Sequence, residues 1–378
     1  MESKPKRILH TFKVMDRGGA ETLIMNIYRH INRDEVQFDF AVHSDLPGHY
    51  DDEIRSLGGR IFHLPSPQKN IATYMRSLRK ILRDHGPFTG IHSHLLFFSG
   101  IVLYIAKKEG IPIRVAHSHS IKDGHTFNLN RKVYHYIMKR LIHSNATQKL
   151  GCSKEACDYL FGKKFWDNNR VKIIKNTIDL KPFERAALKS REHIRKGLSL
   201  PTDVPIIGHV GRFNKVKNHT FIIEVFDKLR QQIPNARLVL VGDGPEKNNI
   251  EALVQKKRLQ DYVYFLGVRS DVPEIMRALD VFLFPSIYEG IPLVLIEAQA
   301  SGVPCVVSNT ITKEVNLGLT KFLNLNQPID NWVTTILENL NNKKHDWETR
   351  IKALKQKGYD VKDVTEQLEA MYVKMGEW

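Results

Sequence analysis

Residues 285–304 have the sequence PSIYEGIPLVLIEAQASGVP, and this segment decides how the fold is interpreted. It follows a short apolar run, 281–284, which is typical of a fully buried strand. Gly290 then precedes a helix that we expect Pro292 to open. A strand, a glycine turn and a helix N-terminus form an anion site, because the free N–H groups and the positive end of the helix dipole both favour a phosphate.

Glu297 is the only charged residue between positions 293 and 299, and no lysine or arginine stands three or four positions away from it. An ionised carboxylate in such surroundings is costly unless a hydrogen-bond donor meets it, and sugar hydroxyls would do so. The alternative is that Glu297 lies on a solvated helix face.

Length and composition indicate a globular protein of two domains. The chain has 378 residues, of which 42% are hydrophobic. Its three cysteines form no C-x-x-C pair, which favours a reducing compartment and argues against a structural zinc site. The basic N-terminus leads into no signal-peptide core, and the longest apolar stretch, 95–106, is too short to span a bilayer. We therefore expect a soluble cytoplasmic protein.

The formal net charge of +16 indicates either an anionic binding partner or another reason for a basic surface. Residues 131–175 contain eleven lysines and arginines against three acidic residues. Such a surface suits an anionic membrane or phosphorylated substrates, although a generally basic surface that keeps the protein soluble is an open alternative. Nucleic acid is disfavoured, because the basic residues lack interleaved aromatics and any known DNA-binding motif.

Short apolar strands alternate with helical patterns along the whole chain, which predicts parallel βαβ units and two doubly wound α/β domains. We place the domains at 1–180 and 181–360, with 179–205 as a Pro-punctuated passage between them and a last helix, about 361–378, that packs back on the first domain. The expected strands are 7–12, 37–42, 60–64, 89–92, 113–116, 206–210, 237–241, 262–266, 281–284 and 304–307, and the expected helices of the first half are 20–31, 71–84 and 100–108.

Gly18 and Gly19 lie where the first strand turns into a helix, so the backbone there can approach a ligand closely. They do not form the G-x-G-x-x-G fingerprint of dinucleotide-binding proteins.

Two H-x-H segments, His92-Ser93-His94 and His117-Ser118-His119, follow strands at the sheet edge where open α/β sheets bind ligands. The spacing places both imidazoles of a pair on one side, as a metal site requires, but the sequence shows no clear third ligand. Hydrogen bonding to substrate is the favoured interpretation, and no metal site is predicted.

The second half places cations and glycines at its own strand ends. Arg212 and Lys217 share the loop after strand 206–210, where a guanidinium and an ammonium together suit a diphosphate. The next strand ends in a tight turn, Gly242-Asp243-Gly244-Pro245. Several strand ends thus direct groups that bind anions toward one predicted crevice.

These motifs together resemble those of the retaining glycosyltransferases of family 4, which have the GT-B fold. The resemblance rests on Gly211-Arg212 with Lys217, on Gly242 to Pro245, on Phe265-Leu266-Gly267, on the Glu289-x7-Glu297 segment and on Gly18-Gly19-Ala20-Glu21. It covers nearly the whole chain. The HSH segments and Ser308-Asn309-Thr310 are similar to the bacterial exopolysaccharide and capsule branch, whereas the D-G-x-x-G turn of many members is missing after Val315.

The resemblance implies a transferase that moves a sugar, expected from a UDP-sugar, to a lipid-linked or growing polysaccharide acceptor at the cytoplasmic membrane face, with no cofactor. Arg212 and Lys217 would hold the diphosphate, Glu297 the ribose and Glu289 the sugar. Gly18 and Gly19 would approach the donor phosphate or the acceptor, and a histidine, either His117 (preferred) or His119, would lie beside the transferred sugar. The remaining residues of the implied donor site are Gly242, Gly290, Ile291, Pro292 and Leu293.

The expected mechanism is retention by front-face transfer, because no residue stands out as a covalent nucleophile. A D-x-D metal motif is absent from the sequence, so we expect transfer without a metal, with cations and a helix dipole neutralising the leaving group. A nucleotide-sugar epimerase of the same shape is the alternative enzyme. No setting for a pyridoxal phosphate lysine is found, which disfavours a phosphorylase.

Overall fold

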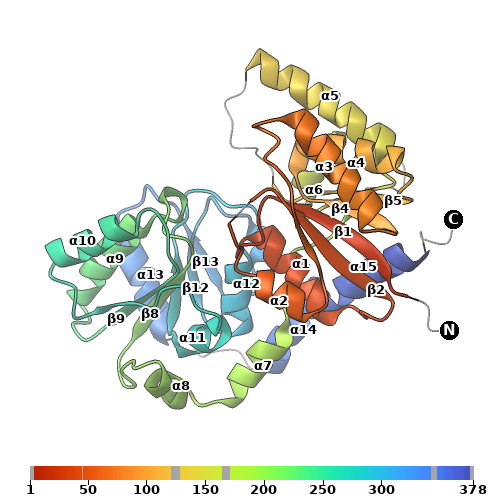
Figure 1. Ribbon diagram of the computed structural model, residues 1–378. Coiled ribbons are helices and arrows are strands. Elements are labelled where there is room, and N and C mark those ends of the chain that lie inside the picture. Colours follow the sequence, from red (N-terminus) through yellow and green to blue (C-terminus); the bar gives the residue numbers. More distant parts are fainter. Residues whose placement is uncertain (1–3, 45, 121–127, 164–170, 342–346, 375–378) are drawn as a thin grey trace. The chain divides into compact units, whose positions relative to one another are not determined.

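The computed structural model describes residues 4–44, 46–120, 128–163, 171–341 and 347–374. The chain forms two compact units. Unit 1 comprises Met1–Thr177 and Asp360–Trp378, and unit 2 comprises Ile178–Tyr359. Each unit is an α/β domain built on a parallel sheet (Figure 1), so the predicted fold class of two doubly wound parallel-sheet domains is confirmed. In the described ranges, no helix is both long and apolar enough to cross a membrane.

Unit 1 contains a seven-stranded sheet in the order β3-β2-β1-β4-β5-β6-β7. Its strands are β1 (Lys6–Phe12), β2 (Val36–Val42), β3 (Ile61–His63), β4 (Gly90–Ser93), β5 (Ile113–Ser118), β6 (Gln148–Gly151) and β7 (Val171–Ile173). Its helices are α1 (Gly19–His30), α2 (Asp51–Ser56), α3 (Ile71–Asp84), α4 (Ser99–Lys108), α5 (Leu129–Asn145), α6 (Lys154–Phe161) and α15 (Val361–Lys374), with a short 3₁₀ helix η1 (Leu96–Phe98).

Unit 2 contains a six-stranded sheet in the order β10-β9-β8-β11-β12-β13. Its strands are β8 (Ile206–Val210), β9 (Arg237–Val241), β10 (Val263–Phe265), β11 (Val281–Phe284), β12 (Cys305–Ser308) and β13 (Thr320–Leu323). Its helices are α7 (Leu180–Leu188), α8 (Arg191–Gly197), α9 (His219–Arg230), α10 (Lys247–Lys256), α11 (Val272–Ala278), α12 (Leu293–Ala300), α13 (Ile329–Asn341) and α14 (Trp347–Gln356), with 3₁₀ helices η3 (Lys215–Lys217) and η4 (Lys313–Val315).

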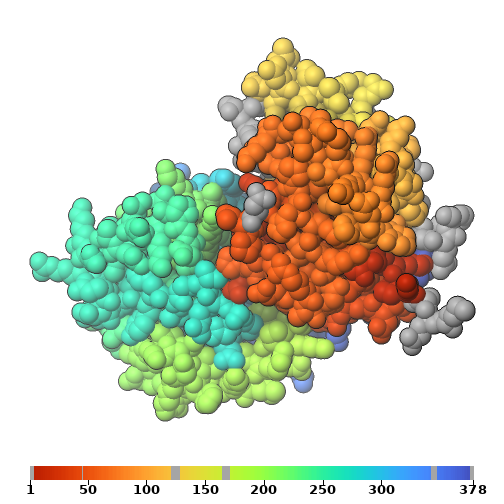
Figure 2. Space-filling model, in the orientation of Figure 1, coloured from red at the N-terminus to blue at the C-terminus, as the bar shows by residue number. Residues whose placement is uncertain are grey.

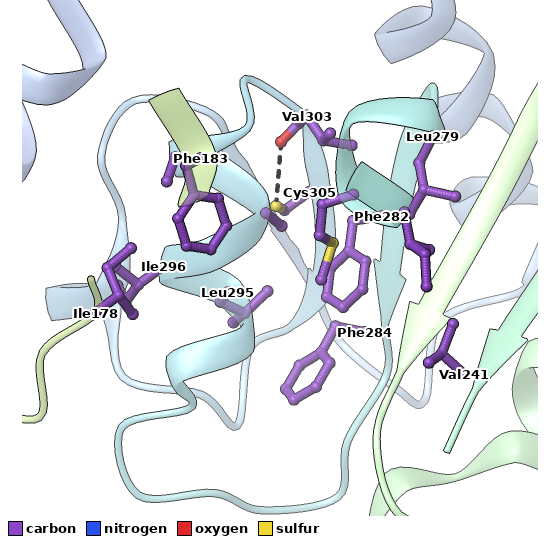
Figure 3. Close-up of a cluster of buried hydrophobic side chains, with 14 of the residues drawn as sticks. Ile178, Phe183, Val241, Leu279, Phe282, Phe284, Leu295, Ile296, Val303 and Cys305 are labelled. Atoms are coloured by element: carbon purple, nitrogen blue, oxygen red, sulfur yellow. Dashed lines mark hydrogen bonds between the residues drawn. The ribbon is translucent and has the colours of Figure 1, made fainter. Parts of the chain in front are cut away.

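The central strands are apolar on both faces because helices cover both faces of the sheet. Strand β11 shows this in unit 2: Phe282 and Phe284 pack in one core cluster, whereas Val281 and Leu283 pack in the other. Figure 3 shows the first cluster, in which Phe282 and Phe284 lie with Leu295 and other apolar side chains. Burial on both sides explains why such strands read as unbroken apolar runs in the sequence.

Helix α15 belongs to unit 1, although it comes after the whole of unit 2 in the sequence. Val361, Val364, Leu368 and Tyr372 recur at helical spacing and are buried in the core that also contains residues of α1 and β2. Figure 1 shows α15, in blue, beside the first strands of this unit. The predicted final segment 361–378 is therefore helical to Lys374, and its last four residues lie outside the described residues.

The predicted passage at 179–205 is wrong. These residues fold as α7 and α8 within unit 2, and the chain crosses between Thr177 and Ile178. Phe183 and Ile194 are buried in the core of unit 2, because the polar, proline-containing segment carries apolar residues on one side of each helix. Three strands, β6, β7 and β13, were not predicted, since each has only three or four residues and includes a lysine.

Candidate active site

The carboxyl edge of the unit 2 sheet is built from glycine-containing turns that hold one another in place. Gly211 donates its N–H to the carbonyl of Val241 at 2.9 Å, and Gly242 donates to the carbonyl of Gly267 at 2.8 Å. Gly242 has φ of +129°, and a Cβ there would collide with the carbonyl of Gly211. Only glycine fits this close approach, so the loops after β8, β9 and β10 form one rigid shelf.

Lys217 is fixed on this shelf by three contacts. The Asn214 side chain caps η3 by accepting the Lys217 backbone N–H at 3.0 Å. The Lys217 ammonium lies 4.6 Å from the ring centre of Phe284, and its Nζ is 2.7 Å from Oε1 of Glu289. The two charged side chains are only 15% and 20% exposed. A partly desolvated ammonium is thus held at the end of β11, the central strand beside β8.

The loop from β11 to α12 is attached to the same shelf. Ile287 donates its N–H to the carbonyl of Val216 at 2.8 Å, and the Asn218 side chain donates to the carbonyl of Pro285 at 3.2 Å. Thr310 donates its hydroxyl to the carbonyl of Ser286 at 2.9 Å. These bonds explain how Glu289, far from Lys217 in sequence, becomes its partner.

Helix α12 begins at Leu293, one residue later than predicted, because Pro292 has an extended ψ of 105° and occupies the N-cap position. No side chain caps this helix end among the described residues. Leu295 and Ile296 anchor α12 in the core cluster of Figure 3, and Ile291 packs against the same cluster. In the first turn, the N–H of Leu295 donates to the carbonyl of Pro292 at 3.0 Å, whereas no described residue accepts the N–H groups of Leu293 and Val294, which are therefore available to an anion.

Gly290 lies exposed just before this helix end. Apart from its chain neighbours, no described atom lies within 4 Å of the position that a Cβ would occupy, and its φ is not positive. We expect Gly290→Ala to leave the thermal unfolding midpoint within about 2 °C of wild type, because the protein itself does not need the space. The same variant should weaken nucleotide-sugar binding by about tenfold or more in a calorimetric titration, because the methyl group enters the space of the ligand. Unchanged binding would show that no ligand approaches Gly290.

Glu297 lies on the second turn of α12 and is partly exposed. Across the described parts of the chain, no side chain pairs with its carboxylate, and burial raises its pKa to about 7. The carboxylate is an unsatisfied hydrogen-bond acceptor, suited to hydroxyl donors.

Arg212 is exposed on the loop that carries Lys217, directly after Gly211. The remaining predicted residues, Gly18, Gly19, His117 and His119, belong to unit 1. Gly18 precedes α1 in an extended conformation, and the Glu21 carboxylate lies against it. Burial, and secondarily the charge of Asp16, raises the pKa of Glu21 to about 7. Apart from its chain neighbours and the backbone of its own helix, no described atom lies within 4 Å of the position that a Cβ of Gly19 would occupy.

The histidines of unit 1 form a network that is larger than the sequence suggested. Nδ1 of His94 lies 2.8 Å from Nε2 of His119, and Nε2 of His94 lies 3.1 Å from Nδ1 of His10. Nε2 of His92 lies 3.2 Å from Nδ1 of His117. Burial lowers the pKa of all five imidazoles, to about 3 for His10 and His119, so the network is neutral near pH 7.

His117 and His119 differ in accessibility. His117, the preferred candidate for the contact to a sugar, is fully buried, whereas His119 is partly exposed at the end of the network. In unit 1 taken by itself, His119 is therefore the more accessible of the two.

Sequence reasoning missed two members of the network. His10 lies inside β1 rather than at a strand end, and Tyr372, whose hydroxyl is 2.6 Å from Nδ1 of His92, lies 280 residues further along the chain. For His10, the only signal in the sequence was a histidine within an apolar strand. For Tyr372, the sequence contained no signal.

Comparison with known proteins places this geometry in a family. Residues 17–182 match the family described as Glycosyltransferase Family 4, and residues 190–356 match Glycosyl transferases group 1. The chain is 42% identical over 340 residues to the protein named as glycosyltransferase EpsF in Bacillus subtilis (strain 168), which covers 89% of this chain and 88% of EpsF. The chain belongs to the family 4 glycosyltransferases. The predicted family is thereby confirmed.

Other relatives agree with this assignment. The transferase is 25% identical over 376 residues to the capsular polysaccharide biosynthesis glycosyltransferase CapH of Staphylococcus aureus, which spans 97% of this chain and 98% of CapH. It is 29% identical over 276 residues to an Escherichia coli protein named UDP-Gal:alpha-D-GlcNAc-diphosphoundecaprenol alpha-1,3-galactosyltransferase, which spans 70% of this chain and 68% of that one.

A solved structure supports the fold. Anabaena HepE in complex with UDP superposes with a TM-score of 0.75 at 18% identity, over 98% of this chain and 100% of HepE. The transferase therefore has the GT-B fold and is a glycosyltransferase of the exopolysaccharide and capsule type, involved in polysaccharide biosynthesis.

Proposed function

We propose that this transferase moves a sugar, with retention of anomeric configuration, from a UDP-sugar to a lipid-linked or growing polysaccharide acceptor. The observation that carries the donor assignment is the partly buried Lys217, held beside Glu289 and the shelf of glycine turns in the unit whose helix α12 has an uncapped N-terminus. An ammonium and free helix N–H groups are the partners that a diphosphate prefers. A UDP complex of HepE and the name of the E. coli relative support a UDP-sugar and a diphosphoundecaprenol-linked acceptor.

Each group at the unit 2 edge has a role in this proposal. Lys217 and Arg212 neutralise the diphosphate together with the first turn of α12, so no metal is needed to hold the leaving group. Glu297 accepts hydrogen bonds from the ribose, which relieves its lack of partners. Glu289 occupies Lys217 in the free protein and is positioned for the sugar once the diphosphate takes the lysine. Gly290 leaves room for the backbone to approach the nucleotide, and Gly242 keeps the shelf together through its close approach to the Gly211 carbonyl.

The proposed reaction needs no covalent enzyme intermediate. The bond from the anomeric carbon to the diphosphate oxygen breaks, the acceptor hydroxyl oxygen bonds to that carbon on the same face, and a phosphate oxygen takes the hydroxyl proton. UDP leaves with the electron pair of the broken bond. The protein supplies positioning and electrostatic stabilisation, which can account for most of such a barrier. Of the two histidine candidates for the contact to the sugar, we favour His119 because it is the accessible one.

A transfer assay tests the function directly. Purified protein with a UDP-sugar and undecaprenyl-diphosphate-linked N-acetylglucosamine should release UDP and form a longer lipid-linked saccharide, with the donor's α configuration kept in the product by NMR. Excess EDTA should not lower the rate by more than about twofold, because cations of the protein replace a metal. An inverted product would refute retention, and loss of activity in EDTA that Mg²⁺ restores would refute metal independence. Isomerisation of the donor without acceptor would identify an epimerase instead.

We further propose that helix α5 brings the enzyme to an anionic membrane surface. The helix contains four lysines and arginines and no acidic residue. Figure 2 shows α5, in yellow, protruding at the margin of unit 1. A basic helix with exposed apolar side chains at helical spacing suits a membrane interface. The exposed apolar residues are Leu129, Val133, Tyr136 and Ile137.

Vesicle binding tests this role of α5. The double variant Val133→Glu/Ile137→Glu should bind phosphatidylglycerol vesicles at least about tenfold more weakly than wild type in a sedimentation assay, because it loses apolar contact and adds repulsion. Leu188→Glu is the matched control, since Leu188 is 84% exposed in unit 2 and should not matter. Equal binding by the double variant and wild type would exclude α5 as the membrane contact.

A further inference from the structure

The histidine network is built on three adjacent strands of the unit 1 sheet, β1, β4 and β5. His10 of β1 is paired directly with His92 of β4, and each H-x-H segment directs two imidazoles to one side of its strand. The parallel register pairs Ser93 with Ala116, so that it brings the next residues, His94 and His117, side by side. The sequence offered no third metal ligand near either pair, but the fold brings the two pairs together.

The nitrogens of three residues are close enough for one ion. One ring nitrogen from each of His94, His117 and His119 lies within 4.8 Å of the other two. The bond of 2.8 Å between His94 and His119 is near the separation of about 3.3 Å that tetrahedral zinc with Zn–N of about 2.0–2.1 Å imposes on two ligands. Small rotations of the rings would therefore admit an ion between them.

Two of these three imidazoles, those of His94 and His117, are already oriented by hydrogen bonds to histidines outside the group. Nε2 of His92 shares a hydrogen bond with Nδ1 of His117, which leaves Nε2 of His117 unoccupied. The other ring nitrogen of His92, Nδ1, is held by the Tyr372 hydroxyl. His10 holds Nε2 of His94 and so directs its Nδ1 toward His119. Such outer hydrogen bonds fix the ring and tautomer of metal-ligating histidines in proteins.

Two ring nitrogens of the group have no partner. Nε2 of His117, a fully buried residue, and Nδ1 of His119 lack any hydrogen-bond partner among the described residues. A buried polar atom without a partner is costly, and an ion at Nε2 of His117 would offset that cost, whereas His119 faces His94 with its other nitrogen, Nε2. His94 and His119 are partly exposed, so an ion can reach the group from solvent.

We propose that His94, His117 and His119 bind one transition-metal ion of the zinc class, with the fourth position open to water. Neutral imidazoles are the preferred ligands of such ions. The ion would link β4 to β5 and stabilise unit 1, and it has no part in holding the donor diphosphate. The proposal does not depend on the glycosyltransferase reaction. The triad of His10, His92 and His94 is not chosen, because His10 and His92 are fully buried.

Metal titration of the full-length chain without a histidine tag tests the proposal. After EDTA treatment and gel filtration, the protein should bind one Zn²⁺ with a Kd in the micromolar range or below, measured by calorimetry. Co²⁺ should give the visible absorption of a tetrahedral site, and saturating Zn²⁺ should raise the unfolding midpoint. His94→Gln and His119→Gln keep hydrogen-bonding groups in place and should weaken Zn²⁺ binding by about 100-fold, because each removes a ligand.

The control is His63→Gln, which changes an exposed histidine of the same unit and should leave binding unchanged. No Zn²⁺ binding by folded wild type, or binding that both ligand variants retain, would overturn the proposal and leave the cluster as a hydrogen-bonded network. If His119 contacts the transferred sugar as proposed above, bound Zn²⁺ also inhibits transfer and EDTA reverses the inhibition. Inhibition of transfer by Zn²⁺ is a test that rests on the proposed function, whereas the Zn²⁺ binding titration does not depend on it.

Discussion

Replacing Lys217 with methionine should lower kcat/KM for the nucleotide sugar by about 100- to 1,000-fold. Methionine keeps an unbranched side chain against the Phe284 ring but removes the ammonium that lies 2.7 Å from Glu289. The diphosphate then gains charge during bond cleavage without its nearest cation, and the unpaired Glu289 carboxylate adds repulsion. Initial rates of UDP release at several donor concentrations measure the effect.

Lys215 provides the matched control for this substitution. It is exposed on the same 3₁₀ helix, so Lys215→Met changes the net charge equally without touching Glu289. Its kcat/KM should stay within about twofold of wild type, since exposed charges are largely screened. Equal losses in both variants would mean that only the general positive charge of the loop matters. Full activity of Lys217→Met would remove Lys217 from the site.

Glu297→Gln should weaken binding of the UDP-sugar and change how binding depends on pH. Burial raises the pKa of Glu297 to about 7, so the carboxyl group is partly protonated in the free enzyme at neutral pH. The ribose hydroxyls prefer the ionised form, and binding therefore lowers this pKa. Wild-type affinity should fall as pH drops below about 7, approaching tenfold per pH unit, and should level off at higher pH.

The glutamine variant should lose this pH dependence. The affinity should be measured over about one to two pH units on either side of the pKa, from about pH 5.5 to 8. At pH 8 it should bind about tenfold or more weakly than wild type, because an amide is a poorer acceptor for two hydroxyls. A UDP-sugar is the ligand to use in this titration, since the free phosphate of UDP titrates near pH 6. Glu338→Gln, an exposed change on α13, should behave as wild type. Identical pH profiles for wild type and Glu297→Gln would contradict the assignment.

The fold could be predicted wherever a segment is buried on both sides. Strands β8, β9 and β11 have the predicted bounds, because their apolar runs are flanked by glycine, proline or polar residues. Strands β6, β7 and β13 were missed since their status as strands depends on pairing with β5, β6 and β12, respectively, rather than on their own composition. The proline-rich polar appearance of 179–205 concealed two helices whose apolar sides are visible only when unit 2 is assembled.

The sequence names the residues of the candidate site but does not reveal how they pair. Glu297 stood out because its surroundings in the sequence lack a cation, and among the described residues burial alone accounts for its raised pKa. The ion pair of Lys217 with Glu289 joins residues 72 positions apart and depends on backbone bonds such as that from Ile287 to Val216. The third histidine of each histidine triad is likewise supplied by strand order, which local patterns do not encode.

A crystal structure of the chain with a bound UDP-sugar tests the central claim most directly. We expect diphosphate oxygens within hydrogen-bonding distance of Lys217 Nζ and of the first N–H groups of α12, with the ribose hydroxyls on the Glu297 carboxylate. The Lys217–Glu289 distance of 2.7 Å should lengthen as the diphosphate takes the ammonium. A nucleotide bound away from Lys217 and α12, with that ion pair and Glu297 unchanged, would contradict the proposed donor site.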